Sequence, residues 1–143
     1  MAYLTVTTQF DVVDPGDGQL SLREAIEQAN ASGGLDTIRF SAAVVGQTLV
    51  LTGGELSIDN DITIDGNNGG TAPQTTIDAN YASRVLSITG GGTEATLNGL
   101  VITHGHTDGE PGGGMRVSYG ASLNLADSTV RYNETNGYYA LVL

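Results

Sequence analysis

The sequence predicts an all-β fold, a parallel β-solenoid of about four coils with an amphipathic capping helix at its N-terminal end. From Asp36 onward, short clusters of apolar residues alternating with Thr or Ser are separated by Gly, Asn and Asp, as short strands are separated by turns. The segment 97–105 aligns with 125–133 at an offset of 28 residues, and a repeat of roughly 20–30 residues is typical of stacked coils. Only one segment has helical periodicity.

Residues 1–44 are predicted to form an N-terminal strand and a helical cap. Residues 3–6 alternate apolar and polar side chains, as a strand does. Ser21 and Glu24 have the spacing of a capping box. Apolar residues then recur at helical spacing, and a pair of glycines ends the helix: Leu22, Ala25, Ile26 and Ala29, then Gly33 and Gly34. Because the first coil of a solenoid exposes both core and strand edge, we expect this helix to cover it.

Residues 45–143 are predicted to form the coils, continuous with the cap as one domain. The segment 61–66 fits the same repeat if residues 71–84 hold an insertion. Crossovers between parallel strands are right-handed in nearly all proteins, so we expect a right-handed solenoid. The chain ends in apolar residues, among them Tyr138, Tyr139 and Leu143, without a predicted plug. This end indicates either a piece of a longer solenoid or a homo-oligomer formed by end-to-end strand pairing. Strands are expected at 37–40, 48–51, 56–58, 62–64, 76–77, 85–88, 97, 100–102, 115–117, 123–125 and 129–131.

The composition excludes several classes of protein. The 143 residues include 16 Asp or Glu against 5 basic residues, all of them Arg, for a net charge of −11. A surface that neutralises phosphates is missing, so nucleic acid is not an expected partner. The absence of Cys excludes a disulfide framework and a thiolate zinc site. No apolar run approaches the roughly 20 residues of a membrane-spanning helix, and no signal peptide is visible at the N-terminus.

His104 and His106 are the candidate metal ligands. Histidines at positions i and i+2 of an extended segment point to the same side, and Asp108 or Glu110 would add an oxygen ligand. Zinc suits such a set, and calcium suits clustered carboxylates, but no complete motif for either ion is present. The competing interpretation is an acidic turn between coils, and no cofactor is expected.

Asp59, Asp61 and Asp65 are the candidate catalytic residues. They alternate along a strand-rich segment, so their carboxylates could share one face and act as a general acid and base on a glycosidic bond. The competing interpretation is turn chemistry, since Asp and Asn side chains bond their own backbone in turns. Of the basic residues, Arg23 is expected to pair with Glu27, four residues later on the helix.

Tyr119 and Tyr132 are the candidate ligand-binding residues. Exposed tyrosines on a flat sheet stack on sugar rings or on another protein, whereas tyrosines along a solenoid also form structural aromatic ladders. The sequence by itself leaves both interpretations open.

One segment resembles a known family. Residues 16–31 read GDGQLSLREAIEQANA and are followed by DTIRF at 36–40. This stretch is similar to the CSLREA region that opens many bacterial right-handed parallel β-helix proteins of the secreted, adhesin-like or polymorphic outer-membrane kind; Leu20 stands where the name-giving Cys would be. The resemblance implies the fold and an extracellular or cell-surface location, but it does not point to any particular biochemical activity. We therefore expect a structural, adhesive module with a carbohydrate or cell-surface partner; the alternative is a carbohydrate-binding or carbohydrate-active β-helix protein.

Overall fold

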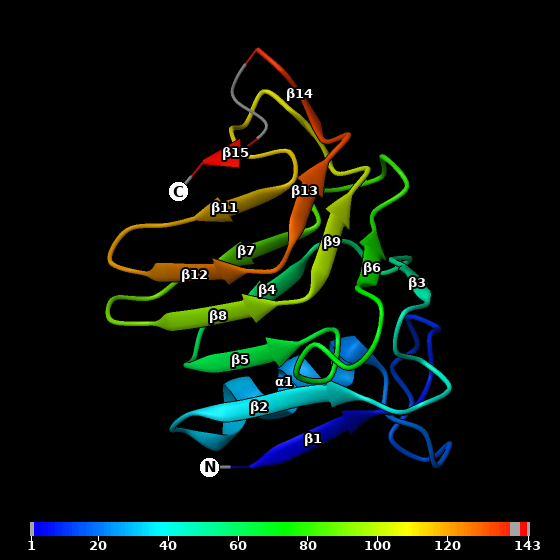
Figure 1. Cartoon of the computed structure of the whole chain (residues 1–143). Coiled ribbons are helices and arrows are strands. Elements are labelled where there is room, and N and C mark those ends of the chain that lie inside the picture. The colour runs from blue at the N-terminus through cyan, green and yellow to red at the C-terminus, as the bar shows by residue number, and fades with distance from the viewer. Residues whose placement is uncertain (1, 138–140, 143) are drawn as a thin grey trace.

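The computed structural model describes residues 2–137 and 141–142, which form a parallel β-solenoid of about four coils, as predicted (Figure 1). All strand pairs are parallel, and successive coils stack strand upon strand. Sheet A contains β1 (Tyr3–Val6), β2 (Asp36–Phe40), β5 (Ile62–Asp65), β8 (Glu94–Asn98) and β12 (Ser122–Ala126). Sheet B contains β3 (Thr48–Val50), β6 (Thr75–Asp78), β9 (Leu100–Thr103) and β13 (Thr129–Arg131). Sheet C contains β4 (Leu56–Ile58), β7 (Leu86–Ile88), β11 (Met115–Val117) and β15 (Leu141–Val142). A small sheet D pairs β10 (His106–Asp108) with β14 (Glu134–Asn136).

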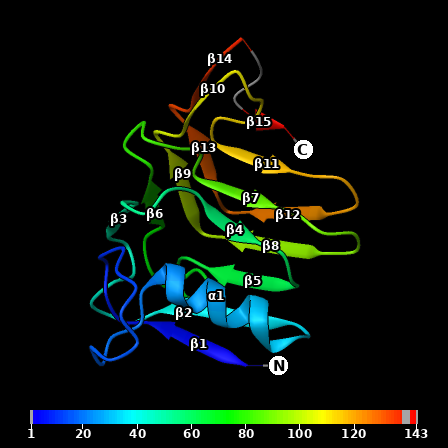
Figure 2. The same ribbon diagram turned by 180° about the vertical axis from the view of Figure 1, so that it is seen from behind.

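The solenoid is right-handed, in agreement with the prediction. The chain runs along sheet A at the front of Figure 1, turns through sheet B at one side and returns along sheet C, which faces the viewer in Figure 2. It rises by one strand spacing of about 4.8 Å with each circuit. The strand β2 lies within residues 1–44, yet it joins the coils to the N-terminal segment, because it pairs with β5 on one side and with β1 on the other.

The register confirms the repeat of 28 residues. Leu125 lies opposite Leu97, and Val130 lies opposite Ile102. The predicted insertion at 71–84 is wrong in its position, because the extra residues form the loop 66–74 between β5 and β6, whereas Gly99 alone joins β8 to β9. The Gly- and Asn-rich segment at 66–70 is where the chain leaves the coil.

Columns of aliphatic side chains fill the interior. In sheet A, Ile38, Ile64 and Leu97 stack directly upon one another and are fully buried. In sheet B, Ile77 and Ile102 form the corresponding column. Burying such a side chain stabilises a fold by about 1.5–3 kcal/mol, so each inward position of a short strand contributes to the cohesion of its coil.

The helix α1 (Leu22–Ser32) covers the first coil, as predicted. Its capping box forms: the Ser21 hydroxyl accepts from the Glu24 N–H at 3.2 Å, and the Glu24 carboxylate accepts from the Ser21 N–H at 2.9 Å. The predicted pair between Arg23 and Glu27 does not form, because Arg23 turns to Asp11, where both oxygens of one carboxylate accept at 2.8 and 2.9 Å. The buried face of the helix contains Leu22, Ala25, Ile26 and Ala29.

Two predictions concern the membrane and the C-terminus. Among the residues that the structure describes, no helix is long and apolar enough to span a membrane. Tyr138, Tyr139 and Leu143, on which the end-to-end pairing prediction depends, lie outside the described residues.

Candidate functional site

The two histidines contact different acids. His104 has a φ of +55°, in the left-handed region, so the alternation that would aim positions i and i+2 to one side does not hold here. The Nδ1 atom of His104 lies 3.0 Å from the Asp78 carboxylate. His106 instead lies between Asp108 and Glu134, at 3.2 and 3.1 Å.

The segment that follows His104 is not a turn but the strand β10. Its residues pair with β14 in the next coil, again 28 positions along the chain. The side chain of Asp108 accepts from Asn136, its partner in register. Among the residues described, no three His, Asp or Glu side chains are grouped to hold a metal ion.

The three candidate catalytic aspartates lie at different positions and make different hydrogen bonds. Asp59 is exposed in the corner between β4 and β5, and its N–H donates to a side chain of the cap. Asp61 precedes β5, and its carboxylate accepts a backbone N–H of the next coil at 2.8 Å. Asp65, nearly buried at the other end of β5, accepts an N–H of the loop that follows it. The carboxylates of Asp61 and Asp65 are therefore bonded to different segments, at opposite ends of β5.

The two candidate tyrosines occupy different corners of the solenoid. Tyr119 is 98% exposed in the turn between β11 and β12. Tyr132 follows β13 at the opposite side of the solenoid in Figure 1. They therefore do not form one platform.

Tyr132 belongs instead to a row of three aromatic rings on successive coils. Its ring is stacked on His104 with centroids 6.1 Å apart, and His104 lies 4.8 Å from the ring of Tyr81. We call Tyr81, His104 and Tyr132 the aromatic row. All three have positive φ, between 55° and 59°, because each lies in the tight corner that the chain makes after leaving sheet B. The side chains remain accessible: Tyr81 is 46% and Tyr132 is 68% exposed.

Polar side chains of sheet B border the aromatic row. Asp78, Thr103 and Arg131 lie opposite one another in register on successive strands. They alternate with core residues, so they lie on the outer face of the sheet, although Thr103 between the other two is only 4% exposed. The Thr103 hydroxyl is buried without a hydrogen-bond partner among the described residues. The guanidinium of Arg131 lies 5.6 Å from the centroid of the Tyr132 ring, within the range of a cation–π contact.

The sequence contained part of the signal for this row. The alignment at an offset of 28 residues puts Tyr132 opposite His104, but Tyr81 precedes His104 by a different spacing because the connections between strands differ in length. Sequence reasoning missed Tyr81 for that reason.

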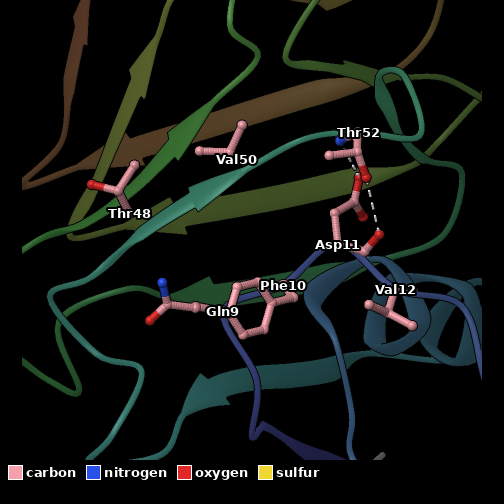
Figure 3. Close-up of a pocket in the computed structure, with 7 residues that line it drawn as sticks. All are labelled: Gln9, Phe10, Asp11, Val12, Thr48, Val50 and Thr52. Carbon is pink, nitrogen blue, oxygen red and sulfur yellow. Dashed lines mark hydrogen bonds between the residues drawn. The ribbon is translucent and has the colours of Figure 1, made fainter.

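A cavity of about 400 Å³ lies beside the first strand of sheet B, between the loop 9–12 and β3 (Figure 3). Its lining includes Phe10, Asp11, Val12 and Val50. Burial alone would raise the pKa of Asp11, but hydrogen bonds from Arg23 and from two backbone N–H groups, together with the charge of Arg23, outweigh burial and lower that pKa below its ordinary value. Asp11 is thus a charged anchor of the loop.

No family model matches the chain, and no curated protein or solved structure matches it either.

Proposed function

We propose that this chain is a non-catalytic, adhesive module of a secreted or cell-surface bacterial protein, and that it binds an uncharged carbohydrate along the aromatic row. The observation that carries the proposal is the row itself: three ring side chains on successive coils, accessible at one corner, beside a column of polar groups. The similarity of residues 16–31 and 36–40 to the CSLREA region supports the proposed family and location.

The row suits a sugar because it combines apolar ring surface with unused polar groups. None of the described hydrogen bonds uses the Tyr81 or Tyr132 hydroxyl or the Nε2 atom of His104. Aromatic side chains with a polar tip suit surfaces where apolar contact and hydrogen bonding to polar groups occur together. A sugar presents such a surface, because its ring has apolar C–H faces and polar hydroxyl groups. The chain carries a net charge of −11, which disfavours an acidic polysaccharide.

Binding without cleavage is supported by the carboxylates. Glycoside cleavage needs two carboxyl groups on either side of one bond. Asp61 and Asp65 hold backbone N–H groups at opposite ends of β5, and Asp78 bonds both a backbone N–H and His104.

The experiment compares glycan binding by the wild type with binding by Tyr132→Asn and Tyr81→Asn. Asparagine tolerates the left-handed backbone of these positions, so it removes the ring without adding strain. The matched control is Tyr119→Asn, at the opposite corner. On an array of uncharged glycans followed by calorimetry, we expect the two row variants to weaken binding by about tenfold or more, equivalent to about 1.4 kcal/mol, and the control to bind as the wild type does.

Three outcomes would refute the proposal. The first is no binding of any uncharged glycan at about 1 mM, a very weak affinity. The second is equal loss of binding in Tyr119→Asn. The third is the appearance of shortened glycans by mass spectrometry after incubation, which would indicate an enzyme.

We also propose that copies of the chain associate through the last described rung of sheet A. Leu125 is 41% exposed in β12, whereas Leu97 directly below it is fully buried. Sedimentation over a range of concentrations tests this: we expect association in the wild type and none in Leu125→Asp, and a monomer at all concentrations would contradict it.

A further inference from the structure

The first rungs of the three sheets are covered differently by the N-terminal segment. Sheet A is extended by β1, which pairs with β2. In sheet C, α1 lies against β4, and the side-chain amide of Asn30 replaces a neighbouring strand: it donates to the Ser57 carbonyl at 2.9 Å and accepts from the Asp59 N–H at 3.1 Å. In sheet B, β3 is the first strand and pairs only with β6.

The outer edge of β3 has unused backbone groups. The Gln47 carbonyl accepts from the Thr76 N–H at 3.0 Å, and the Leu51 N–H donates to the Asp78 carbonyl at 2.8 Å. Odd-numbered residues of this segment therefore direct their backbone groups toward β6. Because these directions alternate along a strand, the N–H and C=O groups of Thr48 and Val50 point away from β6. No described hydrogen bond uses them.

The space beside this edge is closed below by the loop 9–12. The cavity of about 400 Å³ between them has Phe10 on one side and Val50 on the other (Figure 3). Both side chains are exposed, Phe10 at 66% and Val50 at 42%. At one end the Asp11 carboxylate accepts the N–H groups of Thr52 and Gly53 at 2.8 and 2.9 Å, which holds the loop at this distance. We call this space the β3 slot.

We propose that the β3 slot binds one extended peptide segment of a partner protein, which pairs with β3 as an added strand of sheet B. Donors and acceptors alternating along an open strand edge are complementary to another strand. The apolar lining selects an aliphatic side chain at the position that faces Phe10. The net charge of −11 favours basic residues beside the paired segment. This inference concerns a different surface from the aromatic row and stands independently of the proposed function.

The test uses a defined probe, a fluorescent peptide of alternating threonine and valine flanked by lysines, with blocked termini. We expect saturable binding below about 1 mM in fluorescence anisotropy. Amide exchange of Thr48 and Val50 should slow on binding, because their N–H groups enter hydrogen bonds. Two further forms of the peptide carry N-methyl groups on alternate residues, so that each form has the N–H groups of one edge blocked. The form whose blocked edge faces β3 should bind at least tenfold more weakly than the form whose blocked edge faces away.

The variant Val50→Pro removes one unused N–H. It spares the bonds to β6, since proline is tolerated on an edge strand when its missing N–H faces outward. Its matched control is Val50→Thr, which keeps the N–H. We expect at least tenfold weaker binding by Val50→Pro and unchanged binding by Val50→Thr. If Val50→Pro does not fold, Phe10→Ser, at an exposed side chain, serves in its place with the same expected loss, because it removes the apolar wall of the slot without adding a charge.

Either of two results would overturn the inference. One is the absence of peptide binding by the wild type at about 1 mM, which is the weak limit of specific affinity. The other is binding that is unaffected both by the proline variant, or its Phe10→Ser substitute, and by N-methylation of the peptide.

Discussion

Replacing Arg84 by methionine should destabilise the solenoid strongly, because this one side chain ties three coils together. The Arg84 side chain is 6% exposed, although it lies at a corner. Its Nη1 atom bonds Glu55 of the coil below at 2.9 Å. In the coil above, its Nε atom bonds the Gly112 carbonyl at 2.7 Å, and its Nη2 atom bonds the Pro111 carbonyl at 3.0 Å and Glu110 at 3.2 Å.

The magnitude follows from which partners water can reach after the substitution. The carboxylates of Glu55 and Glu110 are 38% and 63% exposed, so they regain hydration and each lost pair costs little, about 0–1 kcal/mol. The carbonyls of Pro111 and Gly112 lose a charged donor, and a bond of that kind contributes about 1.5–3 kcal/mol. The two carbonyl bonds and the two exposed pairs together predict a loss of about 3–8 kcal/mol in the free energy of unfolding.

Urea unfolding followed by circular dichroism measures this loss. Arg116→Met is the matched control, because no described ion pair or hydrogen bond uses the Arg116 side chain; we expect it to change stability by no more than about 0.5 kcal/mol. Arg84→Lys keeps the charge but not the fork of five donors, and should fall between the wild type and Arg84→Met. A loss below about 1 kcal/mol, or a loss equal to that of Arg116→Met, would refute the reasoning.

Three other predictions concern the corners and the cap. Gly99→Ala should lower the free energy of unfolding by about 2 kcal/mol or more, measured by thermal unfolding, because the backbone has a φ of +65° and a Cβ would collide with the Asn67 side chain. Its control is Gly92→Ala, where φ is +84° but no atom lies within 4 Å of the added Cβ, and the expected loss is only about 1 kcal/mol. Equal losses would contradict the steric argument. Because the pKa of Asp11 is lowered in the folded state, its contribution to stability is present above the unfolded pKa of about 3.9 and is lost as the pH falls through the lower, folded pKa. Urea unfolding at a series of pH values should therefore show that the free energy of unfolding falls less steeply toward acid pH in Asp11→Asn than in the wild type. An equally steep fall in both proteins would count against this role of Asp11. Asn30→Ala should lower the free energy of unfolding by about 1–2 kcal/mol and speed amide exchange of Asp59, whose N–H donates to the Asn30 side chain; protection of Asp59 as in the wild type would show that Asn30 does not replace a strand.

The fold was readable from the sequence because its determinants are local. The capping box of Ser21 and Glu24 forms as predicted, since both partners lie within one turn of helix. The repeat of 28 residues sets the register of the upper coils, because inward positions must be apolar and a shift by one residue would expose them.

The candidate site was less readable because its determinants are contacts between coils. His104 was predicted to face the same side as His106, and one left-handed residue was enough to separate them. Arg23 was predicted to pair within its helix, but Asp11 offers both carboxylate oxygens, and the carbonyl of Gly54 completes the site at 2.6 Å. Such partners are far apart in the sequence, and no sequence periodicity predicts that they contact one another.

The sequence by itself therefore determined the class of fold, the capping helix and the stacking of the coils, since alternation, helical spacing and repeat length depend on neighbouring residues. Only the tertiary structure decided where the loop 66–74 leaves the coil, that Tyr81, His104 and Tyr132 form one row, and that the edge of β3 is left without a strand. The physical reason is that connections of unequal length separate residues along the chain while the hydrogen-bonded rungs bring them to a common spacing of about 4.8 Å.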